Sequence, residues 1–402
     1  MAKLSLTDLK DFRGKTVFVR VDYNVPLDAA GQITDDKRIK ATVPTLEYLI
    51  KGGAKVVLAS HLGRPKGKRD PKQSLKSCAE GLAKLINQPV AFADDCIGAG
   101  VEQQVAGLQA GQVLLLENLR FYAEEEKNDA GFAAKLAKGM DIYVNDAFGT
   151  AHRAHASTAA VAELVKQRGG QAAAGFLMEK ELKYLGGVVS HPARPLLCIL
   201  GGAKVSDKIN VIENLLNLAD VILIGGAMAY TFRKAQGYNV GKSLCENDKL
   251  DLAKSLLEKA KGKKFFLPDD QLETLEFKAG APTHNTDGPT IAEGWEGVDI
   301  GAKTIETYKR EIAKAKTIVW NGPMGVFEIP DFSKGTFEVA KAVAQATKNG
   351  ATTVIGGGDS AKAVKQAGLA KEMSFVSTGG GASLEFLEGK PLPGVAALSD
   401  KL

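Results

Sequence analysis

The chain has 402 residues, 45% hydrophobic and 25% charged, so it is long enough for two or three domains and its composition argues against disorder. Its net charge is +5, and the basic residues form no polybasic tract, which argues against a nucleic-acid partner. Its four cysteines lack the spacing of a zinc site, so we expect them to be reduced.

No run approaches the roughly 18 apolar residues that a membrane span needs, and the first ten residues carry charges instead of an apolar core. We therefore expect a cytoplasmic protein that has no membrane partner. A plastid protein whose transit peptide has been removed would have the same sequence features, so that alternative stays open.

Strand-like apolar runs alternate with amphipathic helical stretches such as 42–53, 74–88 and 130–140, which predicts βαβ units and a parallel sheet in an α/β fold. This alternation breaks after residue 158, where one helix is expected before two prolines, Pro192 and Pro195. The predicted domains are an N-terminal domain over 1–172, an inter-domain helix over 173–190, a C-terminal domain over 191–388 and a tail over 389–402. The tail is expected either to fray or to pack back on the N-terminal domain.

Arginines recur at the ends of the strand-like runs in the first half of the chain. Parallel sheets bind ligands beyond the carboxyl ends of their strands, and arginines gathered there would repel one another without an anion. The planar guanidinium suits carboxylate and phosphate groups, so these residues predict a small substrate with several negative charges. A single such arginine could instead be a solvated surface charge. His61 and His152 could add hydrogen-bond donors to the same site. The arginines are Arg20, Arg38, Arg64, Arg120 and Arg153.

Glycine clusters follow the strand-like runs of the second half, as in 201–209 (GGAKVSDKI) and 356–360 (GGGDS). Glycine lets backbone amides approach phosphate closely, and the N-terminus of a helix attracts anions. We expect Lys204 and Lys208 to lie one helical turn apart and to point at the same phosphate. One cluster alone could be an ordinary turn, and Asp359 could be an N-cap or a magnesium ligand. Their recurrence favours a nucleotide-phosphate site.

A segment over 237–243 (GYNVGKS) is similar to a P-loop, but only three residues separate its glycines where the motif needs four. It also follows no apolar strand, so we do not expect Lys242 to bind phosphate. No dinucleotide fingerprint opens a βα unit, which leaves a dehydrogenase unsupported. A non-catalytic sugar-phosphate-binding protein would explain the arginines but not the glycine-rich second half.

Ten segments in order carry a resemblance over essentially the whole chain: VRVDYNVP, DDKRIKATVPTL, SHLGRP, LENLRF, NDAFGTAHRAHAS, GGAKVSDKI, WEGVDIG, WNGPMGVFE, GGGDS and STGGGASLE. With them the chain resembles the phosphoglycerate kinase family. The resemblance implies a monomeric glycolytic enzyme with two Rossmann-like lobes, each a parallel sheet flanked by helices, joined by a hinge helix. It implies 3-phosphoglycerate or 1,3-bisphosphoglycerate on the N-terminal lobe, ADP or ATP with Mg²⁺ on the C-terminal lobe, and closure of the lobes before transfer.

By matching position, the resemblance also implies which residues bind each ligand. The glycerate substrate would be held by Asp22, Tyr23, Asn24, Arg38, His61, Leu62, Gly63, Arg64, Arg120 and Arg153. Tyr23 stands where the family more often has Phe or Leu, and we interpret that position as packing. The nucleotide would be held by Gly202, Ala203, Lys208, Gly226, Gly297, Asn321, Pro323, Glu328, Gly357, Gly358, Asp359 and Ser360, with Glu328 on the ribose and Asp359 on the magnesium ion.

Phosphoryl transfer between an acyl phosphate and ADP uses nucleophiles that are already ionised, so the reaction needs no general base. Catalysis then rests on alignment and on neutralisation of the charge that spreads over the transferred group. We expect Arg38, Lys204 and the helix start near Gly380 to contact that group. A role of His61 or His152 as acid or base is the alternative.

Overall fold

The computed structural model describes residues 2–9 and 11–401. The chain divides into two compact units. The N-terminal unit runs to Leu182 and includes the last segment from Pro391, and the C-terminal unit is Lys183–Lys390. Among the described residues, none of the helices combines the length and the apolar character that crossing a membrane would require.

The N-terminal unit is built on a parallel sheet of six strands in the order β3-β4-β2-β1-β5-β6. Its central strand pairs on both sides, with Val19 opposite Leu58 and Val144. Every residue of β1 and β5 is buried, as expected of strands covered on both faces. The strands are β1 (Thr16–Val21), β2 (Lys55–Ala59), β3 (Val90–Phe92), β4 (Val113–Leu115), β5 (Ile142–Asp146) and β6 (Gln171–Ala174).

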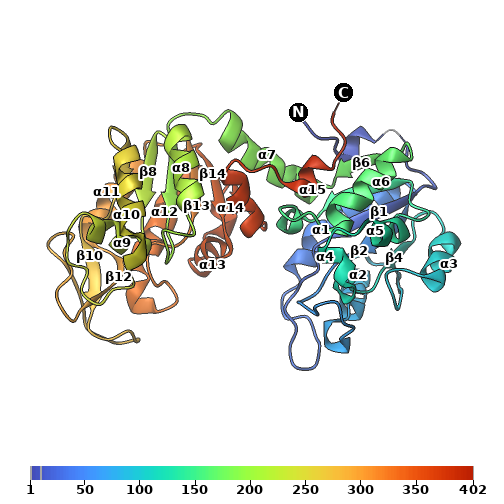
Figure 1. The fold of residues 1–402 in the computed structure, drawn as a ribbon, viewed down its shortest axis with the longest axis horizontal. Helices are drawn as coiled ribbons and strands as arrows, with labels where there is room; N and C mark the ends of the chain where they lie inside the picture. The colour runs from blue at the N-terminus through green and yellow to red at the C-terminus, as the bar shows by residue number, and fades with distance from the viewer. Residues whose placement is uncertain (1, 10, 402) are drawn as a thin grey trace. The chain divides into compact units, whose positions relative to one another are not determined.

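Helices cover both faces of this sheet (Figure 1). α1 and α2 contact each other, and α5 and α6 contact each other. The helices are α1 (Lys37–Lys51), α2 (Lys76–Ile86), α3 (Ala99–Gly107), α4 (Ala123–Glu126), α5 (Ala130–Leu136), α6 (Val161–Gln167) and α15 (Pro393–Ala396), with the short 3-10 helices η1 (Leu6–Asp8), η2 (Pro71–Gln73), η3 (Leu119–Phe121) and η4 (Phe148–Thr150) and the π-helix η5 (Ala156–Ala160).

The last segment of the chain is bonded to the N-terminal unit through its backbone. Leu4 N donates to Ser399 O at 2.8 Å, Ser399 N to Ala172 O at 2.8 Å, and Gly394 N to Ala151 O at 2.8 Å. The first bond joins the two ends of the chain, the second attaches them to the edge strand β6, and the third attaches the last segment to the residue after η4.

The C-terminal unit repeats the architecture with a second parallel sheet, ordered β15-β14-β13-β7-β8-β9. α8, α9 and α10 form one contacting series and α11, α12 and α13 another, on opposite faces of the sheet (Figure 1). The strands are β7 (Leu196–Leu200), β8 (Val221–Ile224), β9 (Lys264–Phe266), β13 (Thr317–Asn321), β14 (Thr352–Gly356) and β15 (Phe375–Val376). The helices are α8 (Ile209–Leu218), α9 (Met228–Ala235), α10 (Leu250–Lys259), α11 (Ala302–Ile312), α12 (Lys334–Lys348), α13 (Gly358–Gln366) and α14 (Gly381–Leu387), with η6 (Asn247–Lys249), η7 (Pro330–Phe332) and η8 (Ala370–Glu372). The predicted fold class of two helix-flanked parallel sheets is confirmed.

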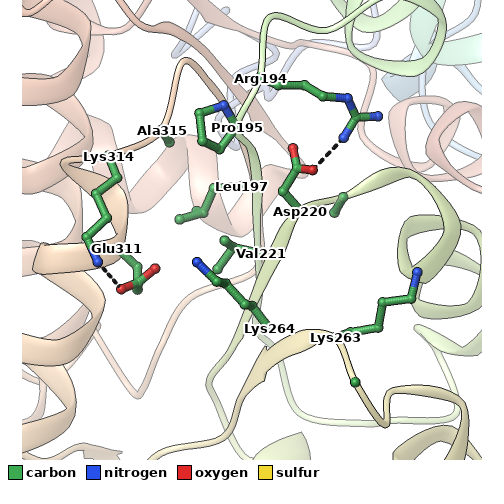
Figure 2. A pocket seen from close by; sticks show the side chains of 12 residues that line it. Arg194, Pro195, Leu197, Asp220, Val221, Lys263, Lys264, Glu311, Lys314 and Ala315 are labelled. Atoms are coloured by element: carbon green, nitrogen blue, oxygen red, sulfur yellow. Dashed lines mark hydrogen bonds and ion pairs between the residues drawn. The ribbon is translucent and has the colours of Figure 1, made fainter.

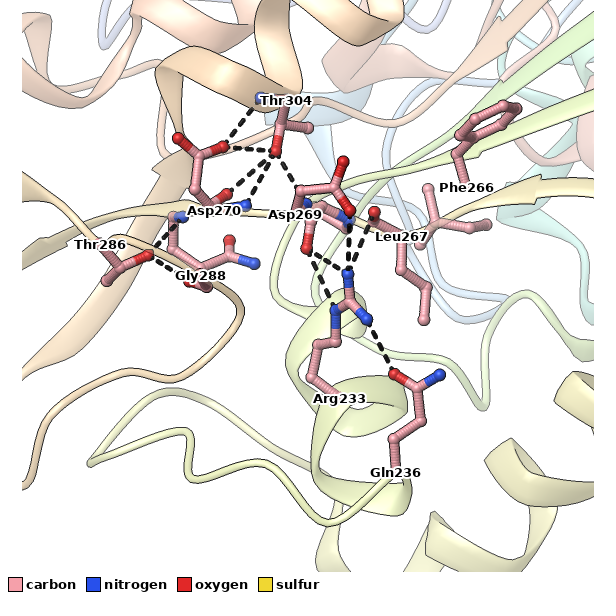
Figure 3. A network of polar contacts seen from close by, with 12 residues as sticks. Arg233, Gln236, Phe266, Leu267, Asp269, Asp270, Thr286, Gly288 and Thr304 are labelled. Carbon is pink, nitrogen blue, oxygen red and sulfur yellow. Dashed lines mark hydrogen bonds and ion pairs between the residues drawn. The ribbon is translucent and has the colours of Figure 1, made fainter.

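A small antiparallel sheet, which the sequence did not predict, lies in the C-terminal unit with the order β11-β10-β12. Its strands are β10 (Gln271–Thr274), β11 (Thr283–Asn285) and β12 (Glu296–Ile300). Figure 3 shows a polar network around the residues that precede β10 in the sequence. Arg233 donates to Pro268 O at 2.6 Å, and Asp270 accepts from the backbone N of Thr304 at 2.8 Å. This network ties the segment that precedes β10 to α9 and to the first turn of α11.

The helix that leaves the N-terminal unit is α7 (Phe176–Ser190), and the prediction that it begins at residue 173 is wrong. Residues 171–174 form β6, which pairs with β5. Asp146, the last residue of β5, accepts from the backbone N of Leu177 at 2.9 Å and of Met178 at 3.2 Å, so it caps the first turn of α7. Alanine favours a helix, and pairing with β5 overrides that local preference in favour of the strand.

Candidate functional site

In the N-terminal unit, the loops after β1, β2 and β4 are tied together at the carboxyl edge of the sheet. Asn24 Oδ1, after β1, accepts from Gly63 N at 2.9 Å. Arg120, in the turn after β4, donates from Nη1 to Gly63 O at 3.3 Å. Arg38, in the first turn of α1, forms a 2.5 Å ion pair with Asp22. Five of the residues predicted for the substrate therefore form two small clusters at one sheet edge.

The remaining residues predicted for the substrate differ in exposure. Arg64 and Arg153 are exposed. Leu62 is buried, and its carbonyl accepts from Asn118 Nδ2 at 2.7 Å. Tyr23 is fully buried, and its hydroxyl lies 2.9 Å from Thr42 Oγ1, so the Tyr23 side chain belongs to the core.

Arg20 does not lie where the sequence placed it. It was predicted to stand with the other arginines at the ligand edge, but it lies inside β1 and is fully buried. Its guanidinium contacts Ser157 and His61. The prediction was wrong because Arg20 is bonded entirely within the protein, where an arginine can be buried if its donors are satisfied.

The charge of this edge comes from arginine. Burial, followed by the nearby Arg20 and Arg120, lowers the pKa of His61 well below its ordinary value. Burial and the same two arginines lower the pKa of His155 to about 4. Both imidazoles are therefore neutral near pH 7, and a bound anion would be balanced by guanidinium groups.

In the C-terminal unit, a cavity of about 580 Å³ lies beyond the carboxyl ends of β7, β13 and β14. It is bounded by loops after these strands and by the first residues of α13 and α14. Its lining includes eleven of the residues predicted for the nucleotide or for the transferred group: Gly202, Ala203, Lys204, Lys208, Asn321, Pro323, Gly357, Gly358, Asp359, Ser360 and Gly380.

The two lysines are not arranged as predicted. α8 begins at Ile209, so Lys204 lies in the loop after β7 and Lys208 is the N-cap residue. The two lysines therefore reach the cavity from the loop before α8 instead of from one helical face. Burial lowers the pKa of Lys208 to about 8, and the carboxylates of Asp207 and Asp359 oppose that shift.

Glycine is required where two loops of the cavity touch. A Cβ on Gly226, which has φ +68°, would lie 2.5 Å from both the N and the O of Gly202. Backbone at that distance cannot move aside as a side chain can. Gly226 does not line the cavity itself, and it supports the loop that does.

Two other predicted nucleotide residues also lie outside the cavity lining. Gly297 is in β12, where a Cβ would lie 2.4 Å from the ring of Tyr230. Glu328 is exposed and its carboxylate lies 3.7 Å from Lys362 of α13.

Asp359 stands in the first turn of α13, exposed on the cavity wall. No group of three or more His, Cys, Asp or Glu residues suited to a metal ion exists among the residues that the structure describes. Asp207 is the other carboxylate that lines the cavity. This pair fits Mg²⁺ that arrives with a nucleotide, because Mg²⁺ commonly takes one or two carboxylates and completes its shell with phosphate oxygens and water.

A larger cavity of about 660 Å³ lies at the opposite edge of the same sheet, at the amino ends of β7, β8 and β9 (Figure 2). Arg194 pairs with Asp220 at 2.7 Å, and Lys314 with Glu311 at 2.6 Å. The C-terminal ends of helices face this edge and favour cations, which accounts for its lysines without a ligand. The cavity at the carboxyl edge is the better candidate.

The segment resembling a P-loop lies in the connection after α9. Lys242 donates to Leu275 O at 2.6 Å and does not line the cavity at the carboxyl edge.

Sequence reasoning missed several residues that line the candidate cavity. Gly201, Gly322 and Gly381 lie in the glycine-rich motifs, but their residue type alone does not separate a lining glycine from one that only allows a turn. Asp207 was not predicted, because Lys204 and Lys208 were expected to lie on a helical face that does not include it. Leu384 carries no sequence signal, because an apolar residue of an amphipathic helix is normally core. These residues are Gly201, Asp207, Gly322, Gly381 and Leu384.

Comparisons with known proteins agree with this arrangement. The family model described as phosphoglycerate kinase matches residues 6–390. The chain is 58% identical over 402 residues to a phosphoglycerate kinase of Solibacter usitatus, covering 99% of this chain and 100% of the relative. It is 57% identical over 402 residues to a cytosolic phosphoglycerate kinase 3 of Arabidopsis thaliana, covering 99% of each. The solved structure of phosphoglycerate kinase from Coxiella burnetii is 42% identical and superposes with a TM-score of 0.89 over 98% of each chain. The chain therefore belongs to the phosphoglycerate kinase family.

Proposed function

We propose that this chain, as a glycolytic phosphotransferase with a carboxyl group as acceptor, reversibly transfers a phosphoryl group from 1,3-bisphosphoglycerate to MgADP, giving 3-phosphoglycerate and MgATP. The observation that carries the proposal is the cavity in the C-terminal unit, where two lysines, two carboxylates and the glycine loops of three strand ends converge. Family membership supplies the reaction.

The glycerate substrate is assigned to the carboxyl edge of the N-terminal unit. Arg38 and Arg120 supply charge, and the exposed Arg64 and Arg153 supply more. Asn24 Oδ1 holds the backbone of Gly63, which keeps the loop after β2 in place. A carboxylate and a phosphate on one small molecule match several guanidinium groups better than a single anion would.

The nucleotide is assigned to the cavity at the carboxyl edge of the C-terminal unit. Backbone amides at Gly357 and Gly358, where α13 begins, suit phosphate oxygens. Asp359 would hold the magnesium ion, which neutralises phosphate charge when bound, and Glu328 is assigned to the ribose.

The chemical step needs charge and alignment more than proton transfer, because both nucleophiles are ionised before the reaction begins. Arg38 from one unit and Lys204 from the other are assigned to the transferred group, with the backbone at Gly380. Neutral His61 does not match a proton-transfer role near pH 7.

Direct transfer requires the two sets of residues to meet, and they belong to different compact units. We assign the units to separate ligands, with α7 as the hinge and closure before transfer. The proposed protein is a monomer. The cytoplasm as its location is supported by a cytosolic relative at 57% identity.

The test is turnover of 3-phosphoglycerate with MgATP, coupled to a dehydrogenase that consumes the acyl phosphate. Turnover that depends on both substrates and on Mg²⁺ is expected. A protein that binds 3-phosphoglycerate but never consumes MgATP would instead be a sugar-phosphate-binding protein, and the proposal would fail.

A further inference from the structure

Arg20 makes its hydrogen bonds without any contact to solvent. It is the fifth residue of β1 and is 0% exposed. Its Nε donates to Ser157 Oγ at 2.8 Å, its Nη1 donates to Val21 O, and its Nη2 lies 3.1 Å from Nδ1 of His61. The guanidinium is thus directed to three partners on three different segments.

The contact with His61 has only one chemically consistent direction. A guanidinium has five N–H donors and no acceptor, so Nδ1 of His61 must accept. An imidazole that accepts at Nδ1 is neutral and carries its proton on Nε2. We propose that Arg20 is a positioning residue that holds His61 as a neutral Nε2–H donor for the anionic substrate; the substrate part rests on the proposed function.

Ser157 and Glu125 hold Arg20 in this orientation. Because Ser157 Oγ accepts from Arg20, its hydroxyl proton is free for Glu125, whose Oε1 lies at 2.5 Å. Ser157 N donates to the other carboxylate oxygen at 3.0 Å. Both oxygens of Glu125 accept, which suits the ionised carboxylate and compensates the buried charge of Arg20. Burial raises the pKa of Glu125, and Arg20 and the Ser157 bonds oppose that rise.

The groups around His61 favour the same state. Arg20 of β1, Arg38 of α1, Arg120 of η3 and His155 before η5 all oppose a positive charge on the ring. Burial disfavours that charge further, and His61 is only 4% exposed. A protonated ring would also lose the Arg20 contact, because two donors would face each other. His61 would therefore donate one hydrogen bond without exchanging protons.

The tautomer can be observed directly in the intact protein. Long-range ¹H–¹⁵N spectra of ¹⁵N-histidine-labelled protein separate the Nε2–H tautomer, the Nδ1–H tautomer and the cation. His61 is assigned among the five histidines by its absence in His61→Asn. We expect a neutral Nε2–H ring at every pH from 5 to 8, with a shifted Nε2–H signal when 3-phosphoglycerate is added.

Each other outcome overturns part of the inference. An Nδ1–H ring, or titration near the ordinary pKa of 6.5, would overturn the role of Arg20. An Nε2–H ring that does not respond to 3-phosphoglycerate, while other signals of the N-terminal unit do, would overturn the substrate role of His61 alone. If no signal of that unit responds, the proposed glycerate site fails while the tautomer assignment stands.

Variants add a functional readout. In Ser157→Ala and in Arg20→Met, we expect His61 to titrate nearer pH 6.5. We also expect the KM for 3-phosphoglycerate at pH 8 to rise about tenfold, which is the effect of losing one hydrogen bond to a charged group. Below that pKa the ring gains a positive charge, so this KM increase should shrink at acid pH. Thr42→Val is the matched control, because it removes the buried partner of the Tyr23 hydroxyl and leaves Arg20 unchanged. An unchanged His61 titration in folded Ser157→Ala, or a changed one in Thr42→Val, would contradict the proposed positioning of His61 by Arg20 and Ser157.

Discussion

The ammonium group of Lys208, at the N-cap of α8, donates a hydrogen bond to Oδ1 of Asn321, the last residue of β13. Both residues line the cavity of the C-terminal unit. Lys208 is half-buried, and burial lowers its pKa to about 8. A group poised at this pKa makes phosphate binding sensitive to pH in the range where the enzyme can be assayed.

This pKa predicts that nucleotide binding takes up a proton. In the free protein Lys208 loses its proton as the pH rises through about 8, and a bound phosphate restores the charged form. The Kd for MgADP should therefore increase about tenfold between pH 7 and pH 9, since each pH unit above the pKa costs about a factor of ten. Calorimetry in buffers of different ionisation enthalpy measures the proton uptake.

Lys208→Arg is the control for this pH dependence, because a guanidinium stays charged throughout that range. Its Kd should be nearly flat from pH 7 to pH 9, whatever its absolute value. An unchanged slope in Lys208→Arg would assign the pH dependence to another group.

Lys204→Ala should lose most of its turnover and stay folded, because Lys204 is exposed in a loop and is assigned to charge that develops in the transition state. One such contact is worth roughly 3–4 kcal/mol in other enzymes, so kcat should fall about 10²- to 10³-fold. Lys242→Ala is the matched control and should be nearly silent, since that lysine contacts Leu275 O. Steady-state kinetics with an unchanged kcat would remove Lys204 from the mechanism.

The sequence predicted the parallel strands, which appear as repeated apolar runs, better than the features that depend on contacts between distant residues. The parallel sheets followed from runs such as 196–200, which are apolar throughout and buried throughout. The start of α7 was misplaced because residues 173–174 are alanines, which favour a helix, and pairing with β5 overrides that preference. Arg20 and Arg38 look alike in the sequence, yet one is buried and bonded to Ser157 whereas the other pairs with Asp22 at the edge. Only the fold separates a positioning arginine from a candidate binding one.

Asp359→Asn is predicted to weaken binding of magnesium nucleotides and to leave the affinity for 3-phosphoglycerate unchanged. The carboxylate is assigned to a hard cation that prefers charged oxygen ligands, and an amide is a poorer one. Separate calorimetric titrations with MgADP, metal-free ADP and 3-phosphoglycerate test the prediction. We expect the advantage of MgADP over ADP to shrink, whereas weakened 3-phosphoglycerate binding with intact MgADP binding would place Asp359 at the other ligand.

Gly226→Ala should displace the loop that carries Gly202, because the new Cβ would lie 2.5 Å from its backbone. Gly237→Ala is a matched control: Gly237 also has a positive φ, +94°, but a Cβ there meets nothing within 4 Å. Both variants should lower the Tm through backbone strain of about 1 kcal/mol. Only Gly226→Ala should also raise the Kd for MgADP, and equal affinities in the two variants would show that the loop tolerates the displacement.

The final prediction concerns closure of the two units. Arg38 and Lys204 belong to different units, so direct transfer requires a conformation that brings both to one phosphoryl group. One ligand alone contacts mainly one unit and shifts the equilibrium only through its preference for the closed form, whereas two ligands together bridge the units. Small-angle scattering should therefore show a clear decrease in the radius of gyration with 3-phosphoglycerate and a magnesium nucleotide together, and a smaller decrease with either alone. A curve that is unchanged with both sites filled would mean that the sites share a unit or are assembled beforehand.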